Sequence, residues 1–128
     1  MASELRVDTL KDSAGANSVG MAYVAEGSAK AWMTANGDGS AVDDSLNTSS
    51  LTDGGTGTFT QNYTASFNNA DYSWVGLAEF TFASNAIILN HVHSGKTTSA
   101  TLFYTYNSYN GASTDTDENC TQVLGDLA

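Results

Sequence analysis

TFTQNYT, at residues 58–64, is the stretch that decides the fold, because its side chains alternate along the run. Successive side chains of a β-strand point to opposite faces, so Phe59, Gln61 and Tyr63 share one face. Residues 100–106, ATLFYTY, alternate in the same way. Both runs therefore predict β-strands rather than helices.

Short β-rich runs recur along the whole chain and are separated by clusters of Gly, Asn, Asp and Ser, with no proline. Those four residue types accept the backbone conformations of tight turns. The candidate strands are Glu4–Leu10, Gly20–Ala25, Ala29–Thr34, Val42–Ser50, Thr58–Thr64, Tyr72–Ala83, Ala86–His93, Ala100–Tyr106 and Thr121–Leu124. Regular spacing of this kind predicts an all-β fold, a β-sandwich or jelly-roll-like domain with an N-terminal arm strand.

The run YSWVGL at residues 72–77 differs from the others because apolar groups occupy both of its faces. A strand of this kind is usually covered on both sides. Two alternatives follow: a central strand within the core, or a strand in contact with a neighbouring subunit.

Length and charge limit the classes of function. A chain of 128 residues has the length of one domain, which we divide into an N-terminal docking arm at residues 1–20 and a compact β domain at residues 21–128. Fourteen acidic and four basic side chains give a formal charge of −10. This balance argues against binding to nucleic acid and to anionic membranes, both of which need Lys and Arg.

The number of cysteines and the composition of the N-terminus bear on the cellular compartment in which the protein is made. The single cysteine, Cys120, has no intrachain disulfide partner, and no apolar run approaches the length of a membrane span. The N-terminus lacks the basic-then-apolar order of a signal peptide. We therefore expect synthesis and assembly in a cytoplasm.

The order of small-residue segments in the first two thirds of the chain resembles a known group of proteins. The segments are Leu5–Gly15, Gly27–Met33, Asn47–Gly57, Tyr63–Thr64 and Asn69–Ser73. Their order is similar to that of short tail-fibre, appendage and decoration-type structural proteins of tailed bacteriophages, especially marine and cyanobacterial phages. The resemblance covers residues 3–80.

The resemblance implies a virion structural protein that assembles in the host cytoplasm, forms a homotrimer and contacts other virion proteins. Its role would be mechanical or adhesive, and no enzymatic activity is expected. The residues expected to dock are Leu5, Val7, Leu10, Trp32 and Trp74. The alternative from another class is a module that binds carbohydrate or a host receptor. A hydrolase acting on surface polysaccharide through Glu26 or Glu79 is a third alternative.

Tyrosines near the end of the second alternating run are candidates for contact with a receptor or a host surface glycan. Tyr104, Tyr106 and Tyr109 lie in a stretch rich in Tyr, Asn, Ser and Gly, the residue types of adaptable binding surfaces. The structural alternative is that these side chains are core aromatics beside an ordinary hairpin tip.

Metal binding has two candidate locations. His91 and His93 are two residues apart on a predicted strand, so their imidazoles share a face. The pair resembles the His-x-His pairs of phage spike and fibre tips, where three chains meeting on an axis would hold Fe, Zn or Ni, although it lies outside residues 3–80. The alternative is two histidines at a strand end. Asn36–Ser40, with Asp43 and Asp44, and Asp115–Glu118 have the oxygen ligands of a calcium loop, although these residue types are also common turn formers.

Overall fold

The computed structural model of the chain describes residue 3, residues 5–80 and residues 87–128, with side chains left out for residues 87–93. The predicted strands that include residues 4, 81–83 and 86 therefore lie partly outside the described residues. In chain order the elements are β1 (Thr9–Lys11), β2 (Ser18–Gly20), α1 (Met21–Gly27), β3 (Ala29–Asn36), β4 (Val42–Leu46), β5 (Thr48–Asp53), β6 (Thr58–Tyr63), β7 (Ser73–Glu79), β8 (Ile87–Lys96), β9 (Ala100–Asn107) and β10 (Glu118–Leu124).

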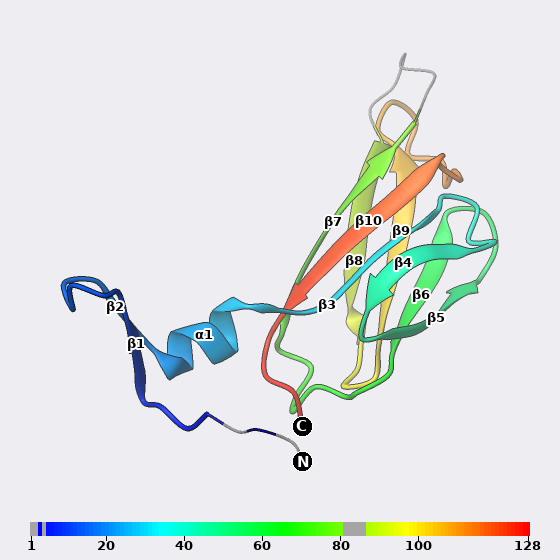
Figure 1. The fold of residues 1–128 in the computed structure, drawn as a ribbon. Coiled ribbons are helices and arrows are strands. Elements are labelled where there is room, and N and C mark those ends of the chain that lie inside the picture. The colour runs from blue at the N-terminus through cyan, green and yellow to red at the C-terminus, as the bar shows by residue number, and fades with distance from the viewer. Residues whose placement is uncertain (1–2, 4, 81–86) are drawn as a thin grey trace.

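Two four-stranded antiparallel sheets pack face to face, which confirms the predicted all-β sandwich. One sheet has the order β4-β3-β10-β7 and the other has the order β5-β6-β9-β8. The strands β1 and β2 form a separate hairpin that, together with α1, projects from the end of the sandwich at which β3 begins (Figure 1). The strand β10 pairs with β3 on one side and with β7 on the other.

The core between the sheets follows from the alternation of the strands. In β6 and β9 every second side chain is buried, and the same holds for β3. The buried apolar side chains are Ala31, Met33, Ala35, Phe59, Tyr63, Phe67, Tyr72, Trp74, Phe103 and Val123. Phe103 lies at the centre, with its ring centroid 5.5 Å from that of Phe59 and 5.3 Å from that of Trp74. Aromatic pairs at this separation stabilise a core beyond the area that they bury.

A buried glutamine joins the two sheets. Gln61 of β6 is fully buried, and its Oε1 accepts hydrogen bonds from Trp74 Nε1 of β7 at 3.2 Å and from Thr121 Oγ1 of β10 at 3.0 Å. Its Nε2 donates to Thr48 Oγ1 of β5 at 2.9 Å. The side chain therefore satisfies polar groups on three other strands, two of them in the opposite sheet.

A second polar junction lies among the core tyrosines. Thr101 Oγ1 is hydrogen-bonded to Tyr63 Oη at 2.6 Å and to Tyr72 Oη at 2.7 Å. Burial raises the pKa of Tyr63 far above its ordinary value, while the hydrogen bond with Thr101 acts in the opposite direction. The neutral phenol is therefore the form that the fold stabilises.

The single strand predicted over Val42–Ser50 is in fact two strands in different sheets, because the chain turns sharply at Asn47. Asn47 has a φ of 53°, in the left-handed region that asparagine tolerates better than most residues. Its side chain holds the turn by accepting from Ala65 N at 2.6 Å and donating to Ala65 O at 3.1 Å.

The strand predicted over Gly20–Ala25 is wrong, since this segment begins at β2 and continues as the helix α1. Met, Ala and Glu favour a helix, and only a short two-residue stretch of β-branched or aromatic side chains, Tyr23 and Val24, opposes it. The expected first strand is also shorter than predicted, because β1 spans only Thr9–Lys11.

The central position considered for the YSWVGL run is excluded, because β7 is the edge strand of its sheet. Trp74 points into the core and is 6% exposed, so its place among the expected docking residues is wrong. The alternation of β7 turns Trp74 inward and leaves Val75 and Leu77 on the outer face.

Candidate functional site

The arm was predicted over residues 1–20, but α1 projects together with the hairpin, so N-terminal arm is used from here on for residues 5–27. It exposes Leu5, Val7 and Leu10, three of the five side chains that the sequence assigned to docking. Leu5 is 80% exposed, Leu10 is 42% exposed and Val7 is also exposed. The helix α1 has no buried residue, and no side chain caps its first turn. Figure 1 shows the arm extending away from the sandwich. These apolar groups are consequently not covered by the domain of the same chain.

The hairpin in the arm has one apolar face. Leu10 of β1 lies directly opposite Val19 of β2, and both are exposed. The turn between the strands is held by Asp12, whose carboxylate accepts from Asn17 Nδ2 at 2.6 Å and from Ala16 N at 3.0 Å. The bond from Asn17 is the main cause that lowers the pKa of Asp12 below its ordinary value. The arm is thus a defined amphipathic unit.

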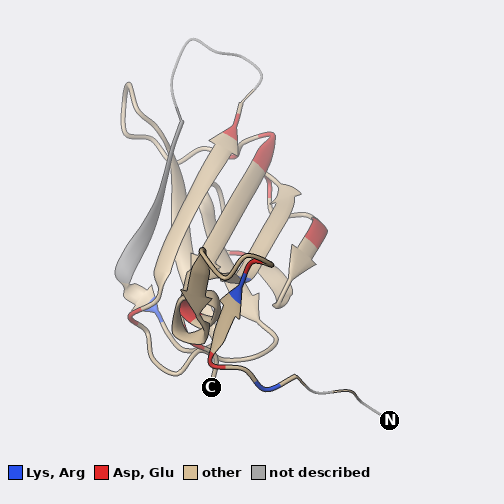
Figure 2. Ribbon diagram, turned by 60° about the vertical axis from the view of Figure 1, so that its left-hand side comes forward, with Lys and Arg blue, Asp and Glu red and all other residues tan. Residues whose placement is uncertain are grey.

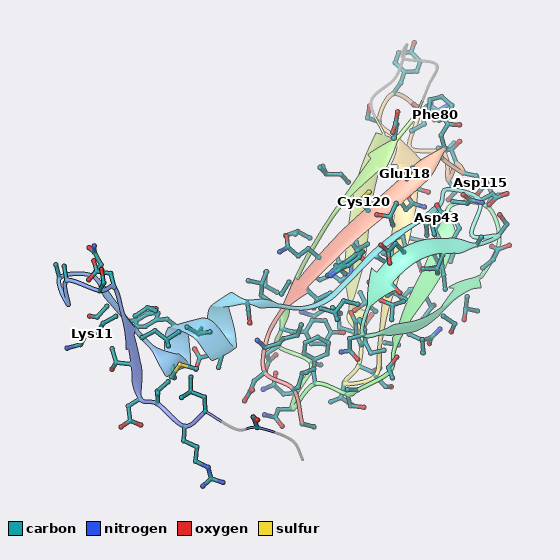
Figure 3. The ribbon with its side chains drawn as sticks, viewed as in Figure 1. Lys11, Asp43, Phe80, Asp115, Glu118 and Cys120 are labelled. Atoms are coloured by element: carbon teal, nitrogen blue, oxygen red, sulfur yellow. The ribbon has the colours of Figure 1, made fainter. Side chains whose placement is uncertain are left out.

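A groove of about 450 Å³ runs along the outer face of β3, β10 and β7. Its lining includes Trp32 of β3, Cys120 and Gln122 of β10, and Val75 and Leu77 of β7. Figure 3 shows Cys120 midway along β10 on this face. The register places Trp32, Gln122 and Val75 in one row across the strands, and Cys120 and Leu77 in the next.

The groove is apolar at its centre and acidic at one end. Val75 and Leu77 are 53% and 79% exposed, which is unusual for aliphatic side chains on neighbouring positions of one sheet face. One row beyond Cys120, Glu118 of β10 lies directly opposite Glu79 of β7. Acidic residues mark the ends of strands on this part of the sandwich (Figure 2).

The thiol of Cys120 has a raised pKa. Partial burial is the largest cause, followed by the hydrogen bond from Cys120 Sγ to Glu118 Oε1 at 3.0 Å, and the charge of Glu79 adds to it. A raised pKa keeps the sulfur in the thiol form, which is a poor nucleophile. Cys120 therefore lies in the groove mainly as an uncharged thiol.

The tyrosines predicted to bind a receptor lie on the outer face of the other sheet. Tyr104 and Tyr106 of β9 are half-buried, and their ring centroids are 5.7 Å apart with a 34° angle between the planes. Tyr109, in the following turn, is 85% exposed. The turn is fixed by the bond from Tyr109 N to Asn107 Oδ1 at 2.9 Å. The structure thus brings Tyr104 and Tyr106 together on one face.

The metal candidates are not brought into a cluster in the described part of the chain. Among those residues, no three His, Cys, Asp or Glu side chains lie close enough together to hold a metal ion. Within the candidate calcium loops, Asp38 accepts from Ser40 N and Asp115 accepts from Gly57 N, so both carboxylates stabilise turns. His91 and His93 belong to β8, and their side chains lie outside the described residues.

Sequence reasoning missed several residues of the groove, above all Leu77, Cys120 and Gln122. It also missed Leu46 of β4, which lies beside the groove, opposite Trp32, and is exposed on the same outer face. Of the residues that line the groove, only Trp32 is among those predicted to dock. The signal that pointed to this face was the apolar character of both sides of residues 72–77.

Comparison with protein-family models, with curated proteins and with solved structures finds no match for this chain. In the described part of the chain, no helix has both the length and the hydrophobicity to cross a membrane. The fold and the two exposed faces are therefore the basis on which the function is argued.

Proposed function

We propose that this chain is a small structural subunit of a bacteriophage particle, a fibre or decoration component that assembles through its N-terminal arm. The observation that carries the proposal is the arm itself, which presents Leu5, Leu10 and Val19 to solvent beside a folded sandwich. Exposed apolar groups concentrated on a projecting segment are typical of interaction sites. The role is mechanical or adhesive rather than catalytic.

The resemblance of the segment order to tail-fibre and decoration proteins supports the assignment to a phage particle and favours a homotrimer. The charge of −10 fits this role, because it keeps free subunits soluble before they assemble. Other virion proteins are the partners that the proposal implies, and the assembled particle is its location.

Light scattering on the purified full chain across a concentration series tests assembly. A trimer has a mass of about 40 kDa, three times the 13.4 kDa of one chain. The variant Leu10→Glu/Val19→Glu should shift the mass toward one chain, while Tyr109→Glu, at a more exposed position outside the arm, should leave it unchanged. A monomer at every concentration would contradict self-assembly.

Association with particles is tested separately. The tagged chain is produced during infection, and the particles are separated on a density gradient. We expect the wild-type chain to sediment in the particle band. An arm variant such as Leu10→Glu/Val19→Glu should instead remain in the soluble fraction. Wild-type chain found only in the soluble fraction would contradict a virion role.

The paired rings of Tyr104 and Tyr106 favour a second candidate function, binding of a host surface glycan. Aromatic rings stack on sugar faces, and Tyr contributes contact area at a low cost in conformational entropy. Titration of the ¹⁵N-labelled protein with oligosaccharides should shift amide signals around β9. The variant Tyr104→Ala/Tyr106→Ala should abolish the shifts, whereas Tyr23→Ala in the arm should not.

A further inference from the structure

The outer face of β7 carries apolar side chains that nothing in the described chain covers. Val75 and Leu77 are exposed there, although the opposite face of the same strand is packed into the core. A strand that is apolar on both faces is normally covered on both. Among the described residues these two side chains stay exposed, which favours the second of the two alternatives drawn from the sequence, contact with a neighbouring subunit.

The arm is too small to be stable without a surface to pack on. Its hairpin has two strands of three residues each, and α1 has seven residues. A lone two-stranded hairpin is marginal in water, and so is a lone helix shorter than about 12 residues. The apolar face formed by Leu10 and Val19 is the side by which the hairpin can pack.

Charge relates the groove to the arm. Glu79 and Glu118 are direct cross-strand neighbours, and like charges in this position repel each other. A cation brought by a partner would relieve that repulsion. Within the hairpin, Lys11 lines the same pocket as Leu10 and Val19. The hairpin therefore presents one cation beside its apolar face, although the arm as a whole carries three acidic and two basic side chains.

One end of the arm lies beside its own domain. Glu26 of α1 lines a pocket of about 260 Å³ together with Asp71 and Asp126 of the sandwich. The hairpin extends away from the sandwich in Figure 1, so its apolar face is not covered by the described residues of the same chain.

We propose that the groove on β3, β10 and β7 is the docking site for the N-terminal arm of a second copy of this chain. The apolar face of the hairpin packs on Trp32, Val75 and Leu77, and Lys11 reaches the Glu79–Glu118 pair. This contact joins two different surfaces, so it builds a closed ring, such as a trimer, or an open filament. The inference rests on the proposed function, because it names the surface through which self-assembly occurs.

The only cysteine of the chain lies in the groove and permits a direct test. A second cysteine is introduced in the full-length chain at Val19→Cys, and the protein is oxidised at pH 8.5. If the arm docks in the groove, a disulfide should form between residue 19 of one chain and residue 120 of another. Covalent oligomers would then appear on a non-reducing gel, and peptide mass spectrometry would identify the linked residues. Tyr109→Cys and Val19→Cys/Cys120→Ser are the matched controls, and both should give far fewer covalent oligomers than Val19→Cys.

A charge exchange provides a second test that needs no cross-link. Lys11→Glu should weaken self-association about fivefold at low salt, and Glu118→Lys should do the same. Combining the two substitutions should restore the affinity, because the opposite charges face each other again. Analytical ultracentrifugation measures all three variants, and folding is checked by circular dichroism.

Specific outcomes overturn the inference. A 19–120 disulfide within one chain would show that the arm closes on its own domain. Oligomers by light scattering without a 19–120 link, or with an equal yield from Tyr109→Cys, would show that assembly uses another surface, leaving the proposed function intact. A wild-type chain that is monomeric at every concentration would instead refute self-assembly and the docking site with it.

Discussion

Replacing Gln61 by Leu tests whether the buried polar junction holds the two sheets together. The change keeps the volume of the side chain almost constant but removes the acceptor of Trp74 Nε1 and Thr121 Oγ1 and the donor to Thr48 Oγ1. A buried polar group that loses its partner costs about 1–3 kcal/mol. Two buried donors, Trp74 Nε1 and Thr121 Oγ1, lose their acceptor in this variant. We therefore expect the free energy of unfolding to fall by about 3 kcal/mol.

This loss is large against the total stability of a small domain, which is about 5–15 kcal/mol. With a urea m-value of about 2 kcal/mol/M, the midpoint of urea unfolding should fall by about 1.5 M. Circular dichroism follows the transition for the wild type and for Gln61→Leu. Gln122→Leu is the matched control, because it makes the same chemical change on the exposed face of β10 and should shift stability by less than about 0.5 kcal/mol.

A double-mutant cycle refines the test. In Gln61→Leu/Trp74→Phe the indole N–H is removed together with its acceptor, so the combined loss should be smaller than the sum of the single losses by about 1 kcal/mol. A loss below about 1 kcal/mol for Gln61→Leu, or strictly additive effects with Trp74→Phe, would refute the argument that Gln61 joins the sheets through these bonds.

Three further predictions concern single positions. Because the fold raises the pKa of Tyr63 above its ordinary value of 10.0, its stabilising contribution is complete below pH 10 and is lost as the pH rises from there. Alkaline unfolding should therefore start at higher pH in Tyr63→Phe, as judged by circular dichroism. Cys120 should react with iodoacetamide more slowly than a small-molecule thiol at pH 8, and Glu118→Gln should speed the reaction by lowering the pKa of the thiol; equal rates with and without Glu118 would contradict this. Gly57→Ala should destabilise the fold by more than about 1 kcal/mol in thermal unfolding, since Gly57 has a φ of 63° and an added Cβ would lie 2.6 Å from Thr105 O. No change in the melting temperature of Gly57→Ala would disprove the steric argument.

The sequence was most informative where one strand could be judged by itself. The alternation of residues 58–64 predicted a strand with Phe59, Gln61 and Tyr63 on one face, and the structure buries that face inside the sandwich. Local alternation reports which side chains share a face, because it depends only on the geometry of a single strand. The overall all-β class followed for the same reason.

The arrangement of strands could not be predicted because it depends on contacts between distant residues. Glu118 pairs with Asn36, far away in the chain, and this pairing makes β10 an interior strand and leaves β7 at the edge. The groove exists only as a result of that order. The sequence therefore showed that both faces of residues 72–77 are apolar without showing which face would remain exposed.

Two local features of the backbone could not be predicted from the alternation of residue types. Asn47 divides a continuous β-rich run, and its left-handed backbone is stabilised by Ala65, a residue whose proximity the sequence does not reveal. The short helix α1 was missed because seven residues give too few repeats for a helical period to stand out.

The central place of β10 has a consequence for the order of events during synthesis. On a ribosome, β3 emerges long before β10, so the sheet that carries the groove remains incomplete until most of the domain has been translated. Pairing between segments so far apart in the chain is also slow to form. The arm, which emerges before β10, is thus available before its own domain offers a groove. Under the proposed docking, nascent arms would meet subunits that have already folded, and an assembly would grow from finished to unfinished chains.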